Sequence, residues 1–62
     1  MIDKLCTGQT VVIADAIYRV TGATKRRGQL CYLLRDAKGG QHALEQKRLL
    51  EGQRDQWLQV KF

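Results

Sequence analysis

The stretch LCYLLRDAKGGQHALE, residues 30–45, decides the fold of this chain. Its first part, LCYLLRD (30–36), alternates so that Leu30, Tyr32 and Leu34 share one face of an extended segment. The opposite face carries a cysteine and a further leucine, so both faces are rich in apolar side chains. A segment that is apolar on both faces is typical of a strand with a neighbour on each side.

The segments on either side of this strand predict hairpins. DAKGGQ (36–41) supplies an aspartate and two glycines that tolerate positive φ, so it predicts a turn into a fourth strand, QHALE (41–45). Upstream, the β-branched run TVVIAD (10–15) predicts a buried strand. AIYRVTGA (16–23) predicts a half-buried strand with Tyr18 and Val20 on its core face, and TKRRGQ (24–29) connects it to the next strand.

The last third of the chain has two interpretations. HALEQKRLLEGQRDQWLQVKF consists largely of helix formers, which favours a three-stranded antiparallel sheet with a C-terminal helix. The alternative is a fourth strand, a single helical turn over QKRLLEG (46–52) and a fifth strand over QWLQVKF (56–62). We favour the alternative because it uses every apolar residue of the segment. The expected fold is then all-β, with five strands and one helical turn before the last.

Length and composition indicate one small globular domain over residues 1–62. Hydrophobic residues make up 44% and charged residues 27%, which is ordinary for a folded domain. A chain this short buries only about 60% of the surface that its unfolded form exposes, so its stability is expected to be marginal. No apolar run approaches the roughly 20 residues that span a bilayer, and no signal-peptide pattern opens the chain. We therefore expect a cytoplasmic protein without membrane contact.

The residues that carry chemistry are few. The two cysteines, Cys6 and Cys31, are far apart and favour reduced thiols over a disulfide. With the single histidine, His42, they are too few for a structural zinc site, which needs about four ligands, so no metal or cofactor is expected. A Cys–His pair in a hairpin is geometrically possible, but no serine, phosphate-binding glycine loop or paired carboxylates accompany it. We expect a protein that is not an enzyme.

Charge gives the strongest functional indication. Lysine and arginine number 11 against 6 acidic residues, for a net charge of +5, which favours anionic partners. Lys25, Arg26 and Arg27 lie together in the connection 24–29. If the flanking strands pair, Arg19 and Arg35 continue this charge down one face of the sheet. The alternative is a solvated turn that prevents edge-to-edge aggregation.

The chain resembles the Src-homology-3-like (SH3-like) small β-barrels, including bacterial Tudor and KOW modules. The resemblance lies in Y-x-L-x-D-x-x-G, from Tyr32 to Gly39, and in A-L-E-x-x-x-L, from Ala43 to Leu49. It covers roughly residues 9 to 51 and implies a five-stranded barrel with a short 3₁₀ turn after the fourth strand. Members of this group bind RNA or DNA, methylated side chains or proline-rich peptides, or are subunits of larger complexes.

Two functions follow as expectations. The first is a binding or adaptor module, because a terminal strand with apolar side chains on both faces has more of them than a small barrel can bury. These residues would dock a protein partner or close a homodimer: Trp57, Leu58, Val60 and Phe62. The alternative is RNA or DNA binding through the basic residues: Arg19, Lys25, Arg26, Arg27 and Arg35.

Overall fold

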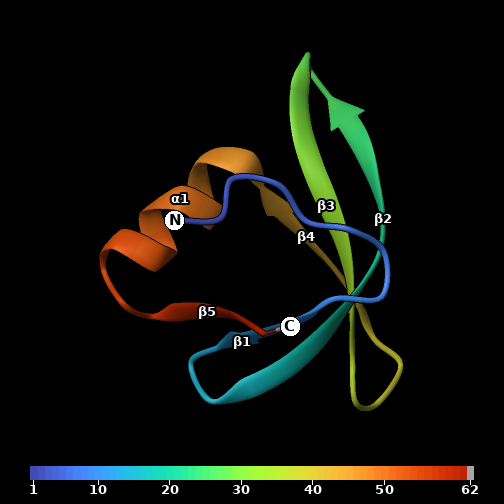
Figure 1. Cartoon of the computed structure of the whole chain (residues 1–62). Helices are drawn as coiled ribbons and strands as arrows, with labels where there is room; N and C mark the ends of the chain where they lie inside the picture. The colour runs from blue at the N-terminus through green and yellow to red at the C-terminus, as the bar shows by residue number, and fades with distance from the viewer. Residues whose placement is uncertain (62) are drawn as a thin grey trace.

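Five strands and one helix form a single layer of sheet with a helix against it (Figure 1). The structure is a computed structural model that describes residues 1–61. Its elements are, in chain order, β1 (Thr10–Ile13), β2 (Ala16–Arg26), β3 (Gln29–Asp36), β4 (Gln41–Glu45), α1 (Gln46–Arg54) and β5 (Leu58–Lys61). All strand pairs are antiparallel, in the order β4-β3-β2-β1-β5. The prediction of five strands with a helical segment before the last is confirmed, and the three-stranded alternative is wrong.

The inner face of the sheet supplies most of the core. Val20 pairs with Leu34, and Tyr32 with Leu44, and all four side chains are buried. Tyr18 is partly buried against the same cluster, so the predicted face for Tyr18 and Val20 is confirmed. A β-bulge between Val20 and Gly22 shifts the register of β2, and bulges of this kind bend a strand and increase its twist.

The helix is longer than the sequence indicated. The predicted turn over 46–52 is a nine-residue α-helix, Gln46–Arg54, and not the 3₁₀ turn that the resemblance implied. Gly52 does not end it, because that position is buried against the residues that follow the helix. A Cβ atom built on Gly52 would lie 2.7 Å from Leu58 Cβ and 3.0 Å from the Trp57 ring. The absence of a side chain at Gly52 therefore allows α1 to pack closely on Trp57 and the start of β5.

Within residues 1–61, no strand pairing closes the sheet into a barrel. In this part of the chain β4 pairs only with β3, and β5 pairs only with β1, so β4 and β5 are the two edges of the sheet. Helix α1 contacts β3, β4 and β5, and with the N-terminal segment it covers the core (Figure 1). The Gln53 side chain holds that segment: its amide oxygen accepts a hydrogen bond from Ile2 N at 2.9 Å, and its amide nitrogen donates to the Ile2 carbonyl.

The connection between β2 and β3 is shorter than expected. The sequence predicted a six-residue connection over 24–29, but β2 continues to Arg26 and only Arg27 and Gly28 form the turn. Both turn residues have positive φ, 53° and 77°, as a two-residue hairpin turn that matches the strand twist requires. Lys25 and Arg26 are consequently strand residues, and they project to opposite faces.

Replacing Gly52 by alanine tests the contact between α1 and β5. Alanine favours an exposed helix by up to about 1 kcal/mol over glycine. Here its methyl group would press on Leu58 Cβ, and overpacking of this kind costs about 1–3 kcal/mol. We expect Gly52→Ala to lower the free energy of unfolding in urea, followed by Trp57 fluorescence. Lys47→Ala, at an exposed helix position, is the control and should change it by less than about 0.5 kcal/mol. Equal or greater stability of Gly52→Ala would contradict this account of the contact.

Candidate functional site

The register of the sheet aligns three cations across four strands. Lys61 of β5 pairs with Thr10 of β1, Thr10 pairs with Arg19 of β2, and Arg19 pairs with Arg35 of β3. Residues opposite one another in antiparallel strands project from the same face. Lys61, Arg19 and Arg35 therefore form one row, which we call the basic row. It lies on the side of the sheet away from the core, which we call the outer face.

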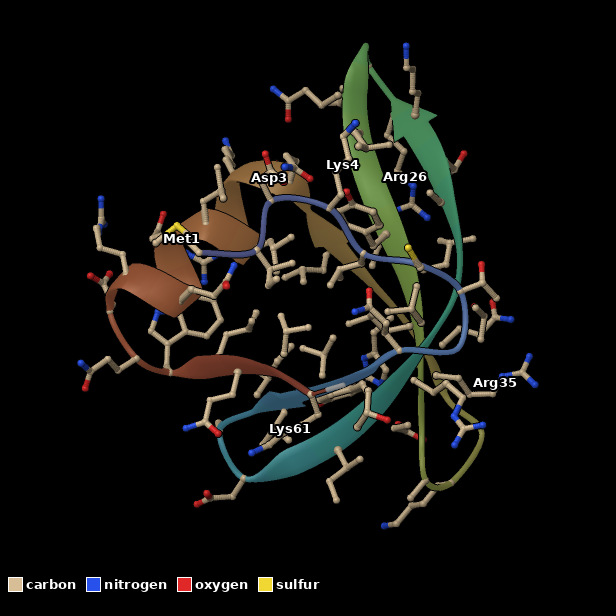
Figure 2. All side chains as sticks on the ribbon, viewed as in Figure 1. Met1, Asp3, Lys4, Arg26, Arg35 and Lys61 are labelled. Carbon is tan, nitrogen blue, oxygen red and sulfur yellow. The ribbon has the colours of Figure 1, made fainter. Side chains whose placement is uncertain are left out.

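The basic row places two like charges opposite each other on neighbouring strands. Arg19 and Arg35 are both exposed and directly opposite each other, an arrangement of like charges that destabilises a strand pair. Both line an open groove of about 410 Å³, together with Thr10, Thr21 and the exposed Ile17. Figure 2 shows the Arg35 side chain pointing away from the body of the molecule. This part of the outer face thus presents two guanidinium groups to solvent.

A second basic groove lies at the other end of the outer face. Its volume is about 580 Å³, and Arg26, Arg27 and Lys47 line it with Glu45. Lys47 Nζ lies 3.6 Å from a Glu45 carboxylate oxygen, so part of this charge is balanced. From Arg35 to Gln29, the partner of Arg26, β3 extends about 20 Å at roughly 3.3 Å per residue. The outer face is basic at both ends.

Two further ion pairs lie on the helix side of the molecule. At or next to α1, Arg48 pairs with Glu51 at 2.7 Å and Arg54 with Asp55 at 3.1 Å. Asp55 holds the pKa of Arg54 above its ordinary value, and Arg54 lowers that of Asp55.

Within residues 1–61, by contrast, no ion pair involves any of the five predicted nucleic-acid contacts: Arg19, Lys25, Arg26, Arg27 and Arg35. The structure brings Arg19 and Arg35 together and places Arg26 and Arg27 at the far end of the same face, while Lys25 projects from the opposite face of β2.

The residues expected to dock a protein partner face the core. Leu58 is only 2% exposed, and Trp57 and Val60 are partly buried against the core cluster. The opposite face of β5 carries Gln59 and Lys61, so the expectation of apolar side chains on both faces is wrong for Leu58–Lys61. These side chains pack into the core between β5 and α1. From the sequence, we expected more apolar side chains here than a small barrel can bury. Phe62, the fourth predicted contact, lies outside the described residues.

Asp36 and His42 form a polar cluster at the turn between β3 and β4. His42 Nε2 lies 2.8 Å from Asp36 Oδ2, and Asp36 Oδ1 accepts hydrogen bonds from the backbone N–H groups of Lys38 and Gly40. The hydrogen bond from His42 is the largest of the effects that lower the pKa of Asp36 below its ordinary value. The Tyr18 and His42 rings pack in a T-shaped arrangement, with their centroids 5.1 Å apart. These contacts link the end of β3 to the turn and to the start of β4.

The cysteines lie apart from His42. Leu34 projects inward and pairs with His42, so His42 lies on the inner face. Side chains alternate along β3, so Cys31, three positions from Leu34, projects to the outer face. Cys31 is buried there and Cys6 is exposed, and both are free. Within residues 1–61, no three His, Cys, Asp or Glu side chains gather closely enough to hold a metal ion. The hairpin therefore does not bring Cys31 and His42 together.

Two features of the site were not found from the sequence. Lys61 joins the basic row through its pairing with Thr10, which is 51 positions away and carries no local pattern. The pairing of Asp36 with His42 depends on the hairpin register, although both residues flank a turn that the sequence predicted correctly. Short sequence patterns report neighbours on one strand and not partners across the sheet.

Comparisons with other proteins find no relatives. No protein-family model, no curated protein and no solved structure matches the chain. Among the described residues, no helix has the length and apolar character needed to cross a membrane. The resemblance to SH3-like barrels consequently remains a prediction.

The Asp36 cluster predicts a pH dependence of stability. Because folding lowers the pKa of Asp36, its contribution is present above the unfolded pKa and is lost as the pH falls through the folded value. In wild type, the free energy of unfolding should decrease below about pH 4. Asp36→Asn should flatten that decrease, measured by urea unfolding between about pH 6 and pH 2.5. Asp3→Asn, at an exposed residue without an ion pair in residues 1–61, is the control and should follow wild type. If the free energy of unfolding of Asp36→Asn decreased at low pH as much as that of wild type, the cluster would not be the cause of the decrease.

Proposed function

We propose that this chain is a non-enzymatic module that binds nucleic acid through the cations of its outer face. The observation that carries the proposal is the Arg19–Arg35 pair, two like charges placed opposite each other with no ion pair to either in residues 1–61. Such a pair costs stability in the free protein, and a bound phosphate removes the repulsion. Guanidinium groups suit this role because their planar forks match phosphate oxygens.

The spacing of the cations favours an extended polyanion over a small anion. The basic row and the Arg26–Arg27 turn are separated by about 20 Å along β3. Between them the outer face carries the uncharged Gly22, Leu33 and Ala43, followed by Glu45, whose carboxylate is paired with Lys47. One phosphate cannot reach both ends, whereas a phosphodiester backbone presents charges along its whole length.

The fold itself supports a related proposal. The strand order, with the helical segment between β4 and β5, follows the sequence order that the resemblance to SH3-like barrels implied. We propose that the chain is an open variant of that group, in which α1 and the N-terminal segment fill the space where a barrel would close. Members of the group bind nucleic acids among other ligands, which agrees with the proposed function without determining it.

Arg35→Gln should weaken binding and stabilise the free protein. For binding, fluorescence anisotropy of labelled nucleic acid at about 50 and 200 mM salt should give a log–log slope of about −2.7 to −4.5 for three to five phosphate contacts on a duplex. Removing one contact should reduce the magnitude of that slope by about 0.9. For stability, relief of the repulsion should raise the free energy of unfolding by about 0.2–0.5 kcal/mol at low salt.

Arg54→Gln is the matched control, because it removes one cation from α1, on the helix side of the core. It should leave the salt slope of binding unchanged. Equal loss of binding in both variants would show that net charge, and not the basic row, attracts the nucleic acid. Absence of binding at low salt would refute the proposed function.

One observation favours a second candidate, a protein partner or homodimer at β5. This strand is an edge of the sheet, so one side of its backbone is available for strand addition. It is also only four residues long, Leu58–Lys61, and its solvent face carries Gln59 and Lys61. Any such contact would rest on backbone hydrogen bonds, because the apolar side chains of this strand face the core.

Sedimentation equilibrium of the full chain tests the second candidate for the homodimer. A self-association through β5 should give a mass that rises from monomer to dimer with concentration. The full chain is required because a truncation before Leu58 would remove a core residue. A constant monomer mass at high protein concentration would exclude the homodimer.

A further inference from the structure

The tip of the β2–β3 hairpin is a two-stranded ribbon. β4 pairs with β3 only from Cys31 to Arg35, so Gln29 and Leu30 have strand partners only in β2. Those partners are Arg26 and Lys25, and the Arg27–Gly28 turn closes the end. Figure 1 shows this tip extending past α1 and the rest of the sheet. We call residues 25–30 the ribbon.

The ribbon carries cations on both of its faces. Lys25 pairs with Leu30, which packs against the core cluster, so Lys25 lies on the inner face. Arg26 pairs with Gln29 and lies on the outer face, and Arg27 occupies the turn between them. All three are exposed. A flat anionic surface would meet only one of these faces, whereas a groove bounded by two phosphate backbones meets both.

Aromatic side chains are absent from the ribbon, although Tyr18 lines the groove that Arg19 and Arg35 form. Tyr32 is only 3% exposed, and Tyr18 packs inward against the core cluster. Trp57 also packs against that cluster, with the Arg48 guanidinium 4.9 Å from its ring centroid. These are all the aromatic residues in the described part of the chain. Proteins that bind single strands gain much of their affinity by stacking bases on exposed aromatic rings. The ribbon carries no such ring, and Tyr18, in the groove of the basic row, is partly buried and packs on His42.

We propose that the ribbon enters the major groove of double-stranded DNA. Lys25 contacts the phosphates of one strand, and Arg26 contacts those of the other. The inference rests on the proposed function and names its ligand. The major groove of B-form DNA, about 12 Å wide, admits a two-stranded β-ribbon. The major groove of an RNA duplex is too narrow and deep for side chains to read. The basic row, about 20 Å away along β3, then meets backbone phosphates outside the groove.

The test compares three labelled ligands of one mixed sequence: a DNA duplex, the corresponding RNA duplex and the single DNA strand. Anisotropy is measured with wild type, Lys25→Gln, Arg26→Gln and the double variant, and Arg54→Gln is the control. We expect the DNA duplex to bind at least tenfold more tightly than the single strand or the RNA duplex. Each single variant should reduce the magnitude of its salt slope by about 0.9, and the double variant by about 1.8. Far-UV circular dichroism checks that these surface variants are folded.

Three outcomes would overturn the inference. Single-stranded DNA or duplex RNA binding as tightly as duplex DNA would refute the ligand while leaving the proposed function intact. A slope change in Arg26→Gln but not in Lys25→Gln would show that only the outer face makes contact, and the ribbon would then lie on the duplex and not in its groove. Binding to none of the three ligands would refute both the inference and the proposed function.

Discussion

The contact between α1 and β5 at Gly52 is the constraint on which the rest of the structure depends. The sheet leaves both edges unpaired, so its core must be covered by something other than a closing strand. Helix α1 does this, and it approaches closely enough only because residue 52 has no side chain. The same approach turns Leu58 and Trp57 inward and brings Gln53 within reach of the Ile2 backbone. A small domain with one shallow core has few such contacts to lose.

The fold also places paired and unpaired charged side chains on different parts of the surface. Glu51 and Asp55 are paired with arginines at or next to α1. The outer face of the sheet holds one balanced pair, Lys47–Glu45, and four arginines without ion pairs in residues 1–61: Arg19, Arg26, Arg27 and Arg35. The fold therefore separates charges that the sequence scatters. The net charge of +5 is therefore distributed unevenly, because unpaired cations gather on the outer face of the sheet.

Local patterns predicted the strands well and long-range contacts poorly. The alternation in 30–36 and the glycine turn after it identified β3, β4 and the hairpin between them, because both are decided by adjacent residues. The extent of α1 was underestimated: the predicted turn stopped at residue 52, whereas the helix continues to Arg54 and packs at Gly52 against Leu58. The basic pair Arg19–Arg35 was anticipated from two neighbouring strands, whereas Lys61 required the pairing of β5 with β1. The expected barrel closure did not follow from any local pattern.

The pairing of β1 with β5 has a consequence for the kinetics of folding. The two hairpins that join β1 to β2 and β2 to β3 link residues close in the chain, and such loops close rapidly. The pairing of Thr10 with Lys61, like the bonds from Gln53 to Ile2, must instead close a loop of about fifty residues, and its entropy cost is met only when the helix is in place. Until that loop closes, β1 lacks its partner β5, and the core lacks Leu58. The speed of that final step sets how long the chain is exposed to aggregation.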